Sequence, residues 1–253
     1  MTKESKNLPT LDLTNFEADS MSGLENVSTE DLAVPFLRIA QALSPQVNKR
    51  ESAYIDGCEQ GDIFNTVDNT FYKGADGVEI VPVAYKKSYL EWMPERKGLA
   101  AVHESSQILS SIVKSEKGQD ILENGNYIQT TANHYVMVLD KEGGYSQAII
   151  AFAGSQLKKS RKWNSMMSAL KMTSSKGAMF TPPTFSHKYL LKSVVEQNDQ
   201  GSWFGWDVSI VGQLSSEQAG VYEAAKQFSV GINTTEVKQT EAITSKQESD
   251  VPF

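Results

Sequence analysis

The chain has 253 residues, of which 40% are hydrophobic, and a formal net charge of −7 at pH 7. This length can bury a substantial core, in one large domain or two small ones. No apolar run reaches the about 20 residues of a membrane span, and residues 1–6 lead into no apolar signal region. The single cysteine, Cys58, excludes an intrachain disulfide and is expected to be a small buried or half-buried thiol. The composition therefore predicts a cytoplasmic protein without membrane association.

The two ends of the chain differ in composition from its middle. Residues 1–31 hold seven acids and two bases without periodic apolar positions, which predicts an acidic, largely disordered N-terminal arm. Residues 231–253 hold four acids and two bases and predict a flexible tail. Charges within residues 32–230 balance, so the net negative charge belongs to the ends, and residues 32–230 are expected to form the folded domain.

Extended segments dominate the first half of this domain. Residues 33–40 predict a strand, which Pro35 confines to a sheet edge or to the start of the strand. Residues 56–77 predict loops with one brief hairpin. Three longer strands are expected where Val, Ile and Tyr are frequent, over residues 78–92, 127–139 and 145–152. A long loop, residues 93–126, is expected between the first two.

Helical spacing begins after the third long strand. Residues 155–172 place four apolar side chains at i, i+3, i+4 and i+7, which predicts a helix with one buried stripe formed by Trp163, Met166, Met167 and Leu170. Residues 174–185, with the pair Pro182-Pro183, predict a loop.

The last elements are a hairpin and a second helix. Residues 188–195 are expected to pair with residues 203–211 through the turn 198–201. Ser215 and Gln218 have the spacing of a capping box, which predicts a helix that runs to about residue 230.

The main elements thus follow the order strand, strand, strand, helix, strand, strand. An OB-fold is a five-stranded Greek-key barrel, and proteins of that fold place a helix between the third and fourth strands. The expected class is therefore α+β, mainly β, with an OB-fold-like five-stranded barrel, a helix between strands 3 and 4, a C-terminal helix and disordered termini.

One stretch of the domain is strongly basic. Residues 143–195 contain eight bases and no acid: Lys158, Lys159, Arg161, Lys162, Lys171, Lys176, Lys188 and Lys192. Ordinary surfaces intersperse the two signs of charge, so a run of 53 residues without a carboxylate favours a polyanion-binding surface over a merely solvated face.

The strand 85–92 combines aromatic and basic residues. Alternation places Tyr85, Lys87 and Tyr89 on one face with Glu91, and the other face carries Lys86, Ser88, Leu90 and Trp92. Aromatic faces beside cations are the means by which proteins hold single-stranded nucleic acid without reading its sequence. The candidate contacts here are Tyr85, Lys86, Lys87, Tyr89 and Trp92, and the alternative is an ordinary half-exposed strand.

Cations on the helix and on the following strand extend this candidate site. Lys158, Arg161 and Lys162 lie opposite the apolar stripe, where they can meet phosphates together with Lys159. Lys188 and Lys192 share one strand face. Trp163 is expected in the core, whereas Trp206 is either core or stacking platform.

The last residues, Glu248-Ser249-Asp250-Val251-Pro252-Phe253, form an acidic end that closes on a Pro-Phe pair. This ending resembles the C-terminal tip of bacterial and phage single-stranded-DNA-binding proteins. The resemblance implies an OB-fold that coats single strands in DNA replication, recombination and repair, in the host cytoplasm if a phage encodes it. It also implies that the tip recruits a polymerase, helicase-primase or nuclease, through Asp250, Val251, Pro252 and Phe253.

Signals of catalysis are scarce. The sequence has no phosphate-cradling Gly-rich motif, and His103, His134 and His187 are far apart, so no enzyme, catalytic residue, metal or cofactor is expected. His134, inside a strand, is expected to be structural. Two other functions stay open: a recombination mediator that anneals strands, and a virion or assembly protein that binds only protein. The sequence also leaves open the oligomeric state, including a homo-oligomer, and the choice between DNA and RNA.

Overall fold

The computed structural model describes residues 22–23, 34–116, 119–199 and 201–234. The chain divides into two units, Met1–Ala33 and Val34–Phe253. All elements described below belong to the second unit.

The second unit is built mainly of strands, with two α-helices among the described residues. The main sheet contains β1 (Phe36–Ile39), β2 (Ile63–Asn65), β3 (Phe71–Tyr72), β4 (Val78–Trp92), β5 (Leu99–His103), β6 (Ile112–Glu116), β7 (Gln119–Leu122), β8 (Tyr127–Leu139), β9 (Tyr145–Ala153), β12 (His187–Asn198) and β13 (Gly201–Gln213). A separate hairpin joins β10 (Met172–Thr173) to β11 (Met179–Phe180). The helices are α2 (Leu157–Ala169) and α3 (Ala219–Thr234).

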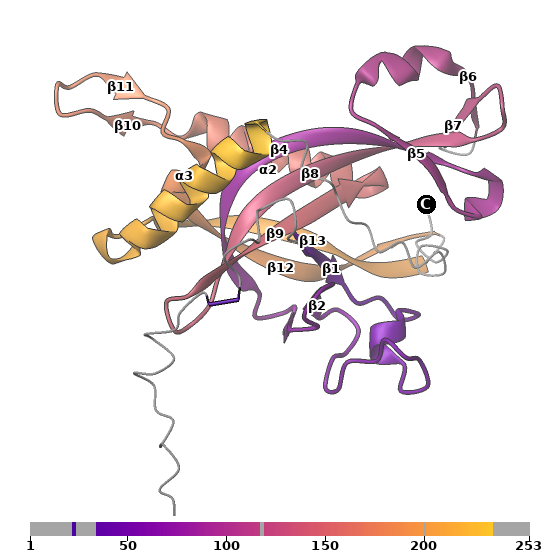
Figure 1. Cartoon of the computed structure of the whole chain (residues 1–253), viewed down its shortest axis with the longest axis horizontal. Coiled ribbons are helices and arrows are strands. Elements are labelled where there is room, and N and C mark those ends of the chain that lie inside the picture. Colours follow the sequence, from indigo (N-terminus) through magenta and orange to yellow (C-terminus); the bar gives the residue numbers. More distant parts are fainter. Residues whose placement is uncertain (1–21, 24–33, 117–118, 200, 235–253) are drawn as a thin grey trace, which may run out of the picture. The chain divides into compact units, whose positions relative to one another are not determined.

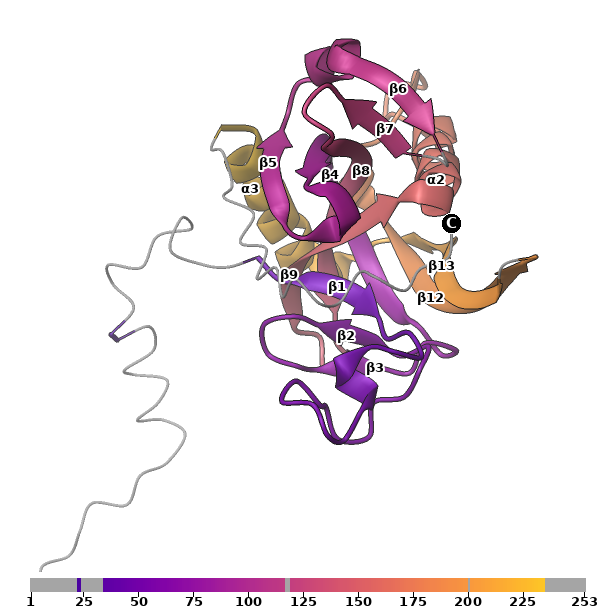
Figure 2. The same cartoon turned by 90° about the vertical axis from the view of Figure 1, so that its right-hand side faces the viewer.

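The sheet curls into a half-barrel around the two longest strands. Its order is β13-β12-β4-β8-β9-β1-β2-β3, while β5 pairs with β4, and β7 joins β6 to β8. β4 and β8 pair antiparallel over most of their length, from Ile80 opposite Val138 to Trp92 opposite Tyr127, and β1 lies parallel to β9. Figures 1 and 2 show these strands arching together, with β5, β6 and β7 gathered at the far end of β4 and β8.

Alternating side chains give the sheet two buried faces. Val78 and Ile80 of β4 point to one face, and Val81 and Val83 point to the other. The register shifts between Pro82 and Ala84, where β4 bulges against β8. A bulge bends the strand and increases its twist, which fits the strong curl of the sheet at this point.

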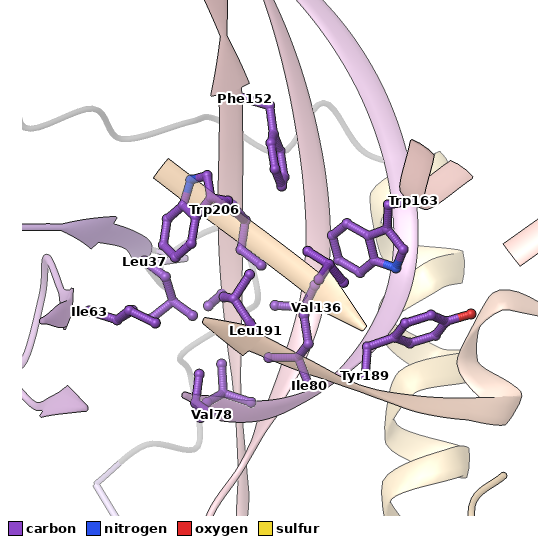
Figure 3. Packing of buried hydrophobic residues seen from close by; sticks show 14 of the residues in the cluster. Leu37, Ile63, Val78, Ile80, Val136, Phe152, Trp163, Tyr189, Leu191 and Trp206 are labelled. Carbon is purple, nitrogen blue, oxygen red and sulfur yellow. The ribbon is translucent and has the colours of Figure 1, made fainter. Parts of the chain in front are cut away.

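Each face is covered by one helix. On the first face, Trp163 and Met167 of α2 enter a large cluster with Phe152, Trp206 and Tyr189, and Figure 3 shows these rings among the aliphatic side chains of β4, β8 and β12. On the second face, the apolar side of α3 packs on β4, β8 and β9 through Val221, Ala225, Phe228 and Ile232. Both helices are thus held by apolar burial, the main favourable contribution to folding.

Side chains cover part of the free edge of β13. Gln41 accepts a hydrogen bond from the Phe204 backbone N–H at 2.9 Å, and its Nε2 donates to the Phe204 carbonyl at 2.9 Å. Two residues on, Gln156 Oε1 accepts from the Trp206 N–H at 3.0 Å, and Lys159 Nζ donates to the Trp206 carbonyl at 2.7 Å. These contacts satisfy backbone groups that a neighbouring strand would otherwise pair.

Much of the predicted architecture is confirmed. The fold is mainly β with few helices, the strands 78–92 and 127–139 have the predicted bounds, and Ser215 and Gln218 form the capping box. The short hairpin within 56–77 is β2–β3. β1 is an interior strand between β9 and β2, so Pro35 marks its start and not a sheet edge.

A five-stranded barrel is not confirmed. The five longest strands stand side by side as β9-β8-β4-β12-β13. Among the described residues β9 pairs with β1 and not with β13, so the row does not close by strand pairing. Instead, β1, from the start of the domain, pairs in parallel with β9, and β2 and β3 extend the sheet further on that side.

Two expected loops contain regular structure. The region 93–126 includes β5, β6 and β7, which pack apolar side chains such as Leu99 and Leu122 against β4 and β8. The region 174–185 includes β11. Its partner β10 begins at Met172, inside the predicted helix 155–172, because α2 ends at Ala169 and Leu170 is already extended. Both strands of that hairpin are too short to produce a recognisable alternation.

Candidate nucleic-acid interface

Three cations stand on the solvent side of α2. Trp163 and Met167 are buried, and because α2 repeats every 3.6 residues this turns Lys158, Arg161 and Lys162 outward. All three are exposed, and none has an ion-pair partner in the described part of the chain. The predicted orientation of these three cations, away from the buried stripe, is confirmed, whereas their contact with phosphates stays a prediction.

Lys159 differs from its neighbours on α2. Its ammonium pairs with Glu196 Oε1, and Glu196 also accepts hydrogen bonds from Gln156 at 2.7 Å and from Trp203 Nε1 at 3.1 Å. Burial alone would raise the pKa of Glu196, but these hydrogen bonds, first of all from Lys159, hold that pKa below its ordinary value. Lys159 therefore fixes α2 to the β12–β13 hairpin and is not free for a phosphate.

The predicted contacts on β12 are also matched by acids. Lys188 Nζ pairs with Glu79 Oε2 at 2.7 Å, and Lys192 stands opposite Asp207 in the β12–β13 register. Opposite charges in cross-strand positions attract each other. Lys188 and Lys192 are half-buried, so the basic surface does not extend onto β12 as the sequence suggested.

Tyr85 and Lys87 share one face of β4, as alternation predicts. Tyr85 is 38% exposed, and its ring lies edge-on to His134 with the centroids 5.0 Å apart. His134 in turn stacks on Trp163 of α2 at 4.3 Å. Lys87 is exposed, whereas Lys86 is half-buried on the opposite face. The His134 ring therefore lies between Tyr85 and Trp163 of α2.

Two aromatic candidates of β4 are not accessible in this structure. Tyr89 is 6% exposed and packs with Leu122 and Ile128. Trp92 is equally buried, and its Nε1 donates to Gln129 at 2.9 Å. The region 93–126 folds over both, which strand alternation could not reveal. We therefore leave Tyr89 and Trp92 out of the interface.

A hollow of about 310 Å³ separates α2 from β13. It is lined by Lys158, Lys159, Lys162, Trp163, Asp207 and Val208. Two of the three exposed cations of α2 thus flank a recess where an anionic group can approach, and one carboxylate, that of Asp207, opposes them. Trp206, left open by the sequence, is 5% exposed and belongs to the core.

His134 is a core residue that links β8 to α2. Its Nε2 lies 2.8 Å from Ser160 Oγ, and Phe152 meets its ring at 5.2 Å. Burial lowers the pKa of His134 to about 3, because the cation would lose its hydration in this cluster. The neutral imidazole therefore supports the structure, as predicted.

The stability of the protein is expected to fall as the pH is lowered from 7 to 5. The folded pKa of His134, about 3, lies below the ordinary value of about 6.5, so the unfolded chain binds a proton that the folded chain excludes. This stability is complete above the unfolded pKa and is lost as the pH falls towards the folded pKa, which gives about 2 kcal/mol between pH 7 and pH 5. Urea unfolding at both pH values measures it. His134→Gln should flatten the dependence, and an unchanged dependence would contradict this assignment.

Other polar clusters serve the fold. Glu91 accepts hydrogen bonds from Asn126 at 2.6 Å, from His103 at 2.8 Å and from Asn124 at 3.2 Å. These bonds, led by that of Asn126, lower the pKa of Glu91 and tie β5 and the turn before β8 to β4. Burial raises the pKa of the Cys58 thiol to about 11, as expected for a structural thiol. Within the described ranges no group of three or more His, Cys, Asp or Glu could hold a metal ion.

Two predicted features lie elsewhere. The tip residues Asp250, Val251, Pro252 and Phe253 fall outside the described residues. Among the helices that are described, none is long and apolar enough to cross a membrane.

These observations define a mainly β protein whose half-barrel carries an exposed basic helix. A family model described as Pam3 phage gp34-like protein matches residues 3–238, and the chain belongs to this phage protein family. Comparison with curated proteins and with solved structures gives no match.

Proposed function

We propose that this protein binds single-stranded DNA without sequence preference and protects it during phage DNA replication, recombination and repair. The observation that carries the proposal is the basic face of α2. Lys158, Arg161 and Lys162 are exposed there, in a stretch of 53 residues without an acid. Asp207 lies across the hollow from Lys158 and Lys162, but none of the three cations has an ion-pair partner among the described residues, so they are free to displace the counterions of a phosphate backbone.

An aromatic contact beside these cations supports the same function. Tyr85 presents part of its ring to solvent and is held against His134, which stacks on Trp163 of α2. Lys87 lies two residues further on the same face. A base stacked on Tyr85 would gain about 1–3 kcal/mol, and the cations would hold the adjoining phosphates.

The order of the long elements supports an OB-like domain in this proposal. β4, β8 and β9 precede α2, and β12 and β13 follow it, which is the order expected of that fold, although the described strands do not close into a barrel. OB-folds bind oligonucleotides across a sheet face and the loops after the first and fourth strands. In this chain those loops correspond to residues 93–126 and to the β12–β13 turn.

Titration of the full chain with oligo-dT, followed by its tryptophan and tyrosine fluorescence, tests the proposal. We expect saturable binding to the single strand, weak binding to a duplex of equal length, and an affinity that falls steeply with salt. An oligo-U titration compares DNA with RNA. Indifference to all three nucleic acids would overturn the proposal and would favour a protein-binding role in virion assembly.

The C-terminal tip is proposed to recruit a replication protein. Glu248 and Asp250 precede Pro252-Phe253, and an aromatic side chain beside acids suits an apolar pocket ringed by bases. A chain that ends at Ser249 is therefore expected to bind oligo-dT at least as well as the full chain. Loss of DNA affinity in that chain would count against a recruiting role. A strand-annealing assay on the same samples separates coating from annealing.

A further inference from the structure

We propose that the β10–β11 hairpin is a second contact arm for single-stranded nucleic acid, which continues the surface that begins on α2. The inference rests on the proposed function and extends it to a part of the chain that the sequence predicted to be a plain loop. It assigns phosphate contacts to Lys171 and Lys176 and base contacts to Met179 and Phe180.

The hairpin is short but well defined. Ser174 N donates to the Ala178 carbonyl at 2.8 Å, and Gly177 N donates to the Ser174 carbonyl at 2.9 Å. Gly177 has φ +79°, the left-handed conformation that closes the turn. At the base of the hairpin, Lys171 Nζ donates to Thr181 Oγ1 at 2.6 Å. Figure 1 shows the hairpin projecting from the body of the second unit.

Large apolar side chains of this hairpin face solvent. Met179 is 68% exposed and Phe180 is 43% exposed, and neither belongs to an apolar core cluster. Lys176, in the turn, is exposed as well. A hairpin of two-residue strands has little intrinsic stability. Met179 and Phe180 do not stabilise it by packing into a core cluster, because both face solvent. Their position favours contact with another molecule.

Charge identifies the kind of molecule. The hairpin and its flanking residues from 171 to 185 contain no acid, and Lys171 and Lys176 have no ion-pair partner in the described part of the chain, so an acidic polymer is attracted to the hairpin. A flat aromatic ring and a thioether next to lysines suit unpaired bases joined by phosphates. Single-stranded DNA combines both properties.

The hairpin follows α2 closely along the chain, with eight uncharged residues, 163–170, between Lys162 and Lys171. α2 is 13 residues long, about 20 Å, and its last turns expose Ser165 and Ser168. Lys171 follows two residues after the helix ends. A strand bound along Lys158, Arg161 and Lys162 can therefore run along α2 and reach the hairpin.

Binding of a short and a long oligo-dT to full-length variants tests this arm. Met179→Ala/Phe180→Ala should weaken binding of an oligonucleotide of about 30 bases about fivefold or more, since each stacked base contributes about 1–3 kcal/mol. Binding of about 8 bases, which α2 and Tyr85 can hold alone, should change less. Lys171→Gln/Lys176→Gln should lower the slope of log affinity against log salt by about 1.4, because each of two lost phosphate contacts on a single strand contributes about 0.7.

Matched controls are available elsewhere on the surface. Val67→Ala removes an exposed apolar side chain between β2 and β3, and Lys49→Gln/Lys226→Gln removes two exposed charges outside the acid-free stretch and outside the proposed binding loops. If the wild-type chain binds oligo-dT and the hairpin variants bind it with the same affinity as these controls, the contact arm is overturned and the proposed function stands. Failure of the wild-type chain to bind any single strand would overturn the proposed function itself. A fall in sedimentation size of the hairpin variants, with DNA affinity unchanged, would reassign the hairpin to self-association.

Discussion

Replacing Trp163 by alanine is expected to lower the free energy of unfolding by about 3–5 kcal/mol, the usual cost of removing a large buried aromatic side chain. Trp163 is 1% exposed and is the residue of α2 that reaches deepest into the half-barrel. Its ring stacks on His134 at 4.3 Å and meets Tyr189 at 5.8 Å. The cavity left behind lies between the helix and the sheet, where neither can collapse without losing other contacts.

Urea unfolding of Trp163→Ala and Trp163→Phe measures this effect. The Nε1 of Trp163 has no hydrogen-bond partner in the described part of the chain, so phenylalanine loses no hydrogen bond and retains a ring against His134. We expect Trp163→Phe to fall well between wild type and Trp163→Ala. A loss below about 1 kcal/mol in Trp163→Ala, typical of surface changes, would mean that α2 is not the helix that closes this core.

The sequence predicts best those elements whose pattern repeats over many residues. β4 and β8 are long and rich in β-branched and aromatic residues, so their bounds follow from composition alone. The stripe that begins at Trp163 identifies α2 and the face it buries. The same periodicity correctly places Lys158, Arg161 and Lys162 on the solvent side, because residues away from the buried stripe of an amphipathic helix face water.

The other features of the fold and of the candidate site depend on contacts between segments that are distant in the sequence, and local patterns cannot show such contacts. Tyr89 looks like an exposed platform until Leu122, 33 residues later, packs on it. Lys159 looks like a free cation until Glu196 pairs with it. Gln41 gives no signal of its role at the edge of β13. The β10–β11 hairpin was missed because two residues per strand carry no period.

Reversing three charges on α2 is expected to weaken binding of single-stranded DNA more than about 100-fold at low salt. Lys158→Glu/Arg161→Glu/Lys162→Glu replaces three phosphate contacts by repulsion, and the salt slope should fall by about 2.1 because each contact on a single strand contributes about 0.7. All three side chains are exposed, and surface changes away from packing usually alter stability by about 0.5 kcal/mol or less. Oligo-dT titrations at several salt concentrations, beside urea unfolding of the same samples, separate lost binding from lost folding.

The matched control carries the same change of charge outside the acid-free stretch. Lys49, Arg50 and Lys141 are also exposed, and Lys49→Glu/Arg50→Glu/Lys141→Glu alters the net charge equally. If only the total charge of the protein matters, the two triple variants lose affinity alike. The interface proposed here requires the α2 variant to lose far more, because direct phosphate contacts act within a Debye length of about 10 Å. Equal losses in the two variants would remove α2 from the binding surface.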